Sequence, residues 1–395
     1  MTNSTERLDS KAIRIAPNEL HIDDVKMYKE IYNQTATYTK QPDFYAGFGT
    51  PHSDKVEQLG KRIDKQNGPY NLFNAVRCTT VDIISHYCTG EPLGQLENSD
   101  ENFNGDFLDA FDAVSVSLWK FMYQPVFRSL MFGIPASIAK IVSRDARLMI
   151  KLYGECHKSA LNFKQNTPKS SHGTVFSSLS DLDEKDMGDE AVDLLIAGSD
   201  TTAYTLAVAV VQICQNTQVK KKLVESLNAG ISDVKNLPSL LGLEQIAYLN
   251  ATVREALRFA IAAPGRLPRV VPRDSKPLVI DDQVIPAGSI IGMSAYTMNF
   301  SKELWGKDAA EFNPDWWLGE DGKSLDTNMC SFSKGLRSCL GQNLAFAEMH
   351  YILAYLFAKY DMELVDKSDN IKVHDRFTTY VTNHAIMVDM KKHKA

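Results

Sequence analysis

One ten-residue segment near the C-terminus carries the strongest signal in this sequence: Phe332-Ser-Lys-Gly335-Leu-Arg337-Ser-Cys339-Leu-Gly341. It places a cysteine between two glycines, just after an arginine and just before a strongly apolar segment. Apolar residues recur there at three- and four-residue steps, which predicts a helix. A helix N-terminus lowers the pKa of a nearby thiol. The pattern therefore predicts a metal-binding thiolate at Cys339, beside glycine backbone that a flat, bulky group can approach.

This segment resembles the cysteine loop of the cytochrome P-450 superfamily, the haem-thiolate monooxygenases, and matches every fixed position of F-x-x-G-x-R-x-C-x-G. The resemblance implies that Cys339 is the axial ligand of haem b (iron protoporphyrin IX), pushing electron density toward O–O cleavage. It implies that Arg337 pairs with a haem propionate, that Phe332 shields the sulfur, and that Gly335 and Gly341 shape the loop. A buried structural cysteine is the ordinary alternative, but five matched positions outweigh it.

A second motif lies inside the longest helical pattern, residues 186–216, which would extend roughly 45 Å. Ala197-Gly198-Ser199-Asp200-Thr201-Thr202 puts glycine, an acid and two threonines in the middle of this apolar helix. Such residues are locally unfavourable there, and local conflicts tend to mark functional sites. Ala197, Asp200 and Thr201 share a face, where an acid beside an alcohol can relay protons. A polar helix–helix contact explains these six residues equally well.

The P-450 resemblance favours the functional interpretation, because the family carries A-G-x-[DE]-T-T at this distance from its cysteine loop. It implies that Asp200 and Thr201 guide protons to bound oxygen. It also implies that Ala197 and Gly198 border the oxygen and substrate pocket, since Gly198 leaves space beside the helix for a ligand.

A third motif, Glu255-Ala-Leu-Arg258, places opposite charges three residues apart on one helix face. Such pairs are usually solvated surface decoration. In order and spacing it resembles the family's E-x-x-R, which implies a structural pair behind the haem. The family usually has arginine where Trp316 stands, completing this network. Because tryptophan cannot donate a fork of hydrogen bonds, we expect Glu255 to be short of a partner.

The proline-rich segment from Ala263 to Pro272 resembles a subgroup common in filamentous fungi. There Arg266 is the candidate for a second propionate contact and Arg269 its rival, although a surface arginine is nearly as good an explanation for each. By the same resemblance Ala262, Leu267 and Thr378 line the substrate pocket.

One departure from the family is more serious. After Phe48-Gly49 the family has a helix with a Trp- or His-headed basic motif that grips a propionate, but here Gly49-Thr-Pro-His52 leads almost at once into the next helical pattern. We therefore expect that helix, and the N-terminal anchor region, to be missing. His52, Lys61 or Arg62 are candidate substitutes, with solvated helix charges as the simpler interpretation.

The predicted fold is one mainly α, multihelical cytochrome P-450 domain over residues 1–395, N-terminally shortened, with small β-sheets. Its 395 residues are 44% hydrophobic, enough for a large core, and no linker or repeat divides them. Strands are expected at 12–16, at 19–22, between 264 and 294, and around 377–388. Helices are expected at 54–65, 69–87, 107–123, 135–166, 186–216, 217–229 and 247–259.

Composition excludes several functions. A net charge of −6 argues against a nucleic-acid partner. The six cysteines are scattered without a C-x-x-C pair, which favours a reducing compartment. The N-terminus is polar, with no signal peptide, and no uncharged run reaches the ~20 residues of a membrane helix. As written the chain is expected to be soluble and cytoplasmic, whereas the family is usually anchored on the cytosolic face of the endoplasmic reticulum.

The predicted function is a haem-thiolate monooxygenase that activates O₂ and inserts one oxygen atom into a small apolar substrate, in secondary metabolism. The resemblance implies a monomer that receives electrons from an NADPH-dependent flavoprotein reductase docking near Lys334. The alternative is a degenerate or mis-spliced relative with weak or no haem binding. Thiolate-haem isomerase or dehydratase chemistry is disfavoured by the intact Asp200-Thr201 pair.

Overall fold

A computed structural model gives the structure of the protein. It describes residues 12–16, 19–22, 50–66, 68–124, 126, 129–130, 133–166, 173–265, 267–271, 278–280, 283–319, 322–335, 338–366, 371–382 and 386–393, some of them by backbone alone. The chain divides into two units, residues 1–46 and 47–395. The described part of the first contains the two predicted strands, β1 (Ala12–Ala16) and β2 (Glu19–Ile22), which pair antiparallel as a hairpin.

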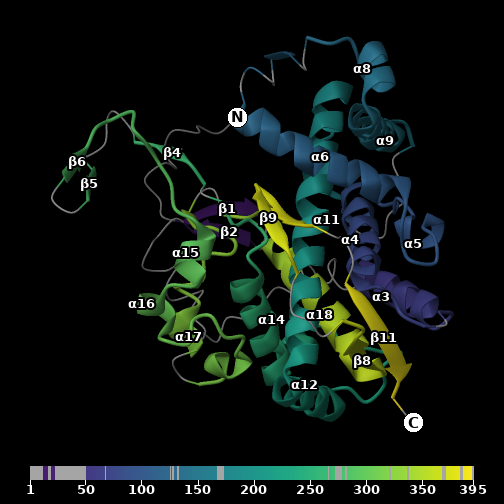
Figure 1. Ribbon diagram of the computed structural model, residues 1–395, viewed down its shortest axis with the longest axis vertical. Helices are drawn as coiled ribbons and strands as arrows, with labels where there is room; N and C mark the ends of the chain where they lie inside the picture. The colour runs from purple at the N-terminus through teal and green to yellow at the C-terminus, as the bar shows by residue number, and fades with distance from the viewer. Residues whose placement is uncertain are drawn as a thin grey trace. The chain divides into compact units, whose positions relative to one another are not determined.

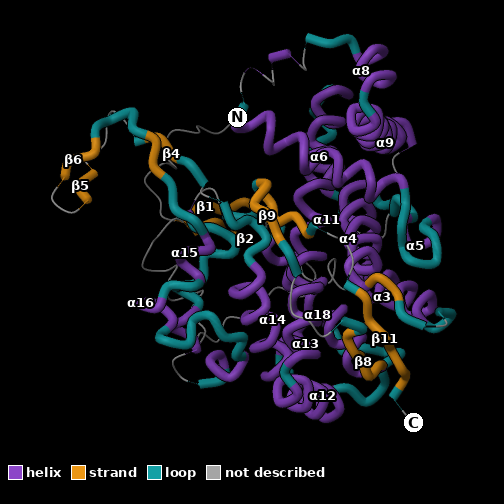
Figure 2. Tube along the Cα trace, viewed as in Figure 1, coloured by secondary structure: helices purple, strands orange, loops and turns teal. Residues whose placement is uncertain are grey.

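The second unit is mainly helical, as predicted (Figures 1 and 2). Its longer helices are α3 (Thr50–Ile63), α4 (Leu72–Thr89), α6 (Asp106–Tyr123), α9 (Arg144–Asn166), α11 (Glu184–Gln215), α12 (Thr217–Gly230), α14 (Ala247–Ala260) and α18 (Gln342–Lys359). Its shorter ones are α5 (Gln95–Asn98), α8 (Ala136–Val142), α10 (Val175–Ser178), α13 (Leu240–Glu244), α15 (Ala295–Asn299), α16 (Lys302–Trp305), the 3₁₀-helix η1 (Pro314–Trp317) and α17 (Gly322–Leu325).

The strands of this unit form small antiparallel sheets. The described pairs are β4 (Arg269–Val270) with β7 (Ile290–Ile291), β5 (Leu278–Ile280) with β6 (Gln283–Ile285), and β9 (Val373–Arg376) with β10 (Thr378–Val381). A three-stranded sheet has the order β3 (Tyr70–Asn71), β11 (Met387–Lys392), β8 (Tyr360–Leu364).

Helix α11 is the centre of the core. It begins where the Asp183 side chain accepts from the amide of Asp186, which satisfies one of the donors that a helix start leaves unpaired. It ends before Asn216, whose side chain caps α12. Helices α4, α9, α14 and α18 pack against it (Figure 1). Most of its side chains from Thr202 to Ile213 are buried, as the apolar residues on several faces predicted.

The structure corrects two details of the predicted elements. Residues 135–166 form two helices, because Ser143 takes an extended conformation between α8 and α9. The strands expected around 377–388 belong to two different sheets, since β10 pairs with β9 whereas β11 pairs with β8 and β3. Strand β8 was not predicted, although its residues alternate between buried and exposed as in a half-buried strand.

Among the described helices, α11 alone is long and apolar enough to cross a membrane by length and composition. However, 67% of its most apolar window is buried inside the structure. Burial of that kind is typical of a core helix.

Candidate functional site

The cysteine loop lies directly before α18, as predicted. The Cys339 amide donates to the Phe332 carbonyl at 2.8 Å, which closes the loop, and Gly335 has a φ of +74°, which favours glycine. The Phe332 ring packs against Phe346 of α18 with ring centroids 5.6 Å apart. Gly341 is the N-cap residue of α18, whose first turn holds no acidic side chain. The loop therefore presents Cys339 at the positive end of a buried helix.

Cys339 is the only exposed cysteine of the six. Partial desolvation raises the pKa of its thiol, and the hydrogen bond from the Gly341 amide opposes that rise without outweighing it. The net direction is upward, opposite to the lowering that was expected from the helix end. Burial raises the pKa of Cys88 and Cys156 to about 12, so these two thiols stay neutral.

The donor set around Cys339 fits a haem better than a bare metal ion. Among the described residues, no group of three histidine, cysteine or carboxylate side chains is placed to hold a metal. A single accessible thiol suits an iron whose other ligands come from a macrocycle. Next to it, Leu340 exposes 92% of its surface and Gly341 adds no side chain, which leaves apolar and bare backbone surface for a flat group.

In the motif of α11, Ala197 is exposed, and Asp200 and Thr201 are half-buried. The Thr201 hydroxyl donates to the Ala197 carbonyl at 2.8 Å, so it bonds to the backbone one turn earlier. Thr205 makes the same contact with the carbonyl of Thr201. This geometry agrees with a threonine that perturbs the helix locally.

The structure explains the glycine at position 198 differently from the prediction that it leaves space for a ligand. A Cβ atom at this position would lie 2.6 Å from Cγ1 of Ile84 on α4, far inside van der Waals contact. The missing side chain thus allows α4 and α11 to pack closely, and the space beside Gly198 is filled by Ile84.

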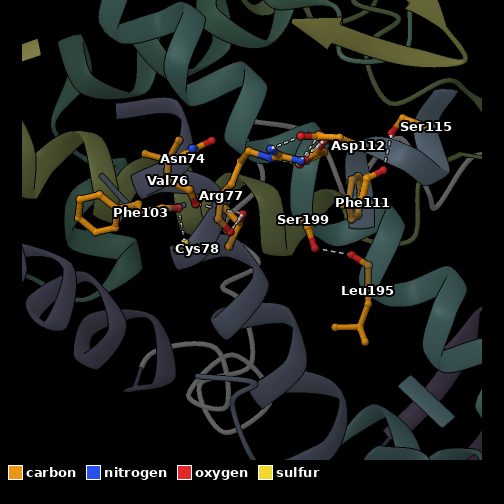
Figure 3. A network of polar contacts seen from close by, with 12 residues as sticks. Asn74, Val76, Arg77, Cys78, Phe103, Phe111, Asp112, Ser115, Leu195 and Ser199 are labelled. Carbon is orange, nitrogen blue, oxygen red and sulfur yellow. Dashed lines mark hydrogen bonds and ion pairs between the residues drawn. The ribbon is translucent and has the colours of Figure 1, made fainter. Parts of the chain in front are cut away.

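Asp200 takes part in a buried cluster that the sequence analysis missed. Figure 3 shows two other members of this cluster, Arg77 and Asp112. Arg77 of α4 donates from Nε to Asp200 Oδ1 at 2.7 Å and from Nη2 to Asp112 Oδ1 of α6 at 2.7 Å. Burial alone would lower the pKa of Arg77, but the two carboxylates outweigh it and raise that pKa. Burial raises the pKa of Asp200, Arg77 lowers it and Asp112 raises it, with a net rise. The sequence did offer one sign of this cluster, because Arg77 is a charged residue inside an apolar helical segment.

Glu348 of α18 is a second buried acid that the sequence analysis missed. It is fully buried, and neither carboxyl oxygen has a hydrogen-bond partner among the described residues. Burial raises its pKa well above the usual range, and the nearby Thr202 of α11 opposes that rise. Glu348 follows Cys339 by nine residues and lies six residues after the first residue of α18, about 9 Å along that helix. Helix α18 therefore links the cysteine loop to the Asp200–Thr201 region.

Glu255 and Arg258 form a fully buried ion pair, not a surface one. Arg258 Nε and Nη2 donate to the Glu255 carboxylate at 2.9 and 2.7 Å, and its remaining donors reach three backbone carbonyls at 2.7–2.9 Å. The expectation that Glu255 lacks a partner is wrong. The indole of Trp317 donates to it at 3.0 Å, and the Asn313 amide donates at 2.8 Å. Trp316 instead places its ring 5.0 Å from the Arg258 guanidinium.

The segments predicted to line the pocket are partly brought together. The Thr379 amide donates to the Ala262 carbonyl at 2.9 Å, so Thr378 begins its strand beside Ala262. The Leu267 amide reaches the Met293 carbonyl at 3.3 Å. Arg269 donates to the neighbouring Pro268 carbonyl at 2.9 Å. Arg266 and Arg337, the two predicted propionate contacts, lie outside the described residues.

Lys61 and Arg62 do not replace the expected propionate-binding helix. Arg62 donates to Ser99 Oγ at 2.6 Å, and Lys61 pairs with Glu57 at 2.8 Å. Gly60 beside them packs on Tyr355, which lies thirteen residues after the first residue of α18, so about 20 Å of helix separates them from the loop. The side chain of His52 lies outside the described residues.

Comparisons with known proteins agree with this site. A family model described as cytochrome P450 matches residues 11–388. The chain is 28% identical to the cytochrome P450 monooxygenase aneF of Aspergillus aculeatus, over 91% of this chain and 82% of that protein. It is 30% identical to the monooxygenase sdnE of Sordaria araneosa, over 92% and 82%. It is also 26% identical to a protein of Claviceps fusiformis named as an inactive cytochrome P450 monooxygenase, over 93% and 80%.

The alignment with the Aspergillus protein covers 412 positions, more than the 395 residues of this chain, so that relative has internal residues with no counterpart here. The match nevertheless spans nearly the whole described structure, and the monooxygenase names agree with the predicted enzyme class. On this evidence of sequence, fold and site together, the chain belongs to the cytochrome P450 family.

Proposed function

We propose that this protein is a haem-thiolate monooxygenase that inserts one atom of O₂ into a small apolar substrate of secondary metabolism. The observation that carries the proposal is the pairing of two regions through one helix. The exposed Cys339 thiol stands just before α18, and α18 packs against α11, where Thr202, next to Thr201, lies near enough to Glu348 to lower its pKa. A single described helix thus runs from the proposed iron ligand to the helix that carries the proposed acid–alcohol pair.

Cys339 would hold haem b through its thiolate, with Phe332 against the loop, and Arg337 and Arg266 would pair with the propionates. When bound, this cofactor supplies the activation of O₂, because the thiolate pushes electron density toward O–O cleavage. Gly335 and Gly341 keep the loop free of side chains on the cofactor side.

The proton-delivery pair is Asp200 and Thr201. The Thr201 hydroxyl donates to the Ala197 carbonyl and can accept a second hydrogen bond, so to pass a proton on it would turn its O–H away from that carbonyl while it accepts a new proton. Asp200 is only partly buried, with 16% of its side chain exposed, which leaves a route for solvent protons. A positioned acid of this kind contributes typically about 10²–10⁴-fold to a rate.

Ala197, Ala262, Leu267 and Thr378 would form the substrate surface, a short apolar set that suits a small apolar molecule. The exposed Lys334 would meet an acidic patch on an NADPH-dependent flavoprotein reductase. Residues 1–395 would act as one P450 domain and as a monomer.

The absorption spectrum of the protein, reduced in the presence of carbon monoxide, tests the proposal. We expect the Soret band of the reduced, CO-bound protein to show the thiolate red shift, and Cys339→Ser to lose it. Cys330→Ser is the matched control, because Cys330 lies nine residues away and is half-buried. Retention of the shift by Cys339→Ser, or an unshifted wild-type band, would refute the assignment.

A second candidate is a non-catalytic relative that binds haem weakly or not at all. Two observations favour it: relatives have internal residues that this chain lacks, and one relative is named inactive. Haem-to-protein stoichiometry after expression separates the two functions. Tight equimolar haem supports the monooxygenase, and substoichiometric haem lost on dilution supports the alternative.

A further inference from the structure

The upstream end of the cysteine loop depends on contacts other than regular secondary structure. From Asp326 to Phe332 the chain belongs to no helix or strand. The loop closes where the Cys339 amide donates to the Phe332 carbonyl at 2.8 Å. The position of Phe332 therefore sets the backbone position of Cys339, and whatever fixes the residues around Phe332 also helps to aim the thiol.

The side chain of Asn299 holds the two residues that directly precede Phe332. The Cys330 amide donates to Oδ1 of Asn299 at 3.0 Å, and Nδ2 of Asn299 donates to the Ser331 hydroxyl at 2.9 Å. Asn299 is the last residue of α15 and is fully buried. One buried amide thus fixes the base of the loop.

The same side chains bind the C-terminal end of α14. The last four carbonyls of a helix have no partner within that helix. Ser331 Oγ donates to the Leu257 carbonyl at 2.6 Å, and Asn299 Nδ2 donates to the Arg258 carbonyl at 3.1 Å. In return, Nη1 of Arg258 donates to the backbone carbonyl of Asn299 at 2.9 Å. The base of the loop is therefore attached to the end of a buried helix.

Both the oxygen and the nitrogen of the Asn299 amide are needed for these contacts. The oxygen accepts from Cys330, and the nitrogen donates to Arg258 and Ser331. If the amide were turned over, N–H groups would face an N–H group and oxygen would face a carbonyl. A group left without its partner away from water is costly, so removing this side chain should loosen the chain at Cys330 and Ser331.

We propose that Asn299 and Ser331 form a clamp that fixes the base of the cysteine loop on α14 and keeps the Cys339 thiolate in place as the iron ligand. This inference rests on the proposed monooxygenase function. Asn299 is a positioning residue in it, since it reaches Cys339 only through the backbone of residues 330–332. The Glu255–Arg258 ion pair then acts on the loop through Asn299, which exchanges two hydrogen bonds with Arg258.

Hydrogen exchange of the full chain, resolved by mass spectrometry of its peptides, tests the clamp without turnover. We expect Asn299→Ala and Ser331→Ala to speed exchange in residues 330–341 by about tenfold or more, because hydrogen bonds that hold the loop are lost. The buried residues 349–357 of α18 should exchange at the wild-type rate. Ser331→Thr keeps a hydroxyl and should keep the wild-type rate in both segments.

Asn328→Ala is the matched control. Asn328 lies two residues before Cys330, but its described side-chain contacts are long, to the Leu304 carbonyl at 3.4 Å and from Thr327 Oγ1 at 3.5 Å. This variant should leave exchange in residues 330–341 unchanged. An effect as large as that of Asn299→Ala would overturn the clamp.

The second readout is the spectrum of the reduced, CO-bound protein at equal haem content. Loss of a residue that only supports the fold lowers the amount of folded protein and leaves the position of the Soret band unchanged. We expect Asn299→Ala instead to transfer intensity from the thiolate-shifted band to the unshifted one. Ser331→Ala should give a smaller transfer, and Ser331→Thr and Asn328→Ala none.

The outcomes separate the clamp from the function on which it rests. An unshifted wild-type spectrum overturns the proposed function together with the role of the clamp toward iron. A shifted wild-type spectrum combined with unchanged exchange in residues 330–341, equally faster exchange in residues 349–357, or an unchanged Asn299→Ala spectrum overturns the clamp alone. If Asn299→Ala does not fold, the comparison of Ser331→Ala with Ser331→Thr decides by the same criteria.

Discussion

Two buried arginines are held in opposite ways. Arg258 meets one carboxylate and three backbone carbonyls, and neither it nor Glu255 has any exposed side-chain surface. Arg77 meets two carboxylates, of which Asp200 is 16% and Asp112 24% exposed. The first network uses every strong donor of its arginine in fixed contacts. The second shares one amino group between two acids and borders solvent. The difference separates a fully enclosed ion pair from one whose acids remain within reach of water.

Glu255→Ala should give the largest effect. It leaves the Arg258 guanidinium buried without its carboxylate, which typically costs about 3–5 kcal/mol. We expect a large drop in the denaturation midpoint, or failure to fold. Glu57→Ala, in the exposed pair with Lys61, is the control and should change stability by about 0–1 kcal/mol. Similar small effects for both would show that the Glu255 network is not a scaffold.

Gly198→Ala should give the next largest effect. The new methyl group would lie 2.6 Å from Ile84 Cγ1, so either the Ile84 side chain or the two helices must shift, at a cost of about 1–3 kcal/mol. Gly154→Ala in α9 is the control, since its Cβ meets nothing within 4 Å and should add about 0.5–1 kcal/mol of stability. Chemical denaturation measures both, and a stabilised Gly198→Ala would contradict the close packing.

Trp317→Phe tests which tryptophan supports the buried Glu255–Arg258 ion pair. It removes the indole donor to Glu255 and leaves a buried carboxylate oxygen short of one bond, at a cost of about 1–3 kcal/mol. Trp316→Phe keeps a ring near Arg258 and loses no such donor, so we expect a smaller change in the denaturation midpoint. The reverse order would restore the view that residue 316 completes the network.

Glu348→Gln tests the remaining buried acid through pH. The folded-state pKa of Glu348 is raised, so its stabilising contribution is fully present below the unfolded-state pKa of about 4.3 and is lost as pH rises through the folded value. Each unit of that rise costs about 1.4 kcal/mol at high pH. The variant should therefore lose less stability than the wild type between acid and neutral pH. An identical pH dependence of unfolding would place the titration elsewhere.

The sequence predicted the helices and the cysteine loop well because each depends on local spacing. The helical spacing of apolar residues predicted α11, and a ten-residue motif predicted the loop around Cys339. Contacts between distant segments could not be predicted, because local spacing does not determine them. The partner of Asp200 lies 123 residues away in α4, and the donor to Glu255 is the neighbour of the tryptophan that the family pattern singled out. The sequence also predicted a lowered pKa for Cys339, whereas desolvation raises it. Desolvation depends on the packing of the whole loop, which the sequence does not give.

The small sheet that contains β3 has a consequence for synthesis of the chain. The Leu72 amide, at the start of α4, donates to the Ile386 carbonyl, and the Ile386 amide reaches the Asn71 side chain across 315 residues. At about 5–20 residues per second a ribosome needs tens of seconds to make that intervening stretch. The start of α4 therefore waits for Ile386 to emerge, and a nascent chain stopped before Ile386 would leave this helix start open to chaperones.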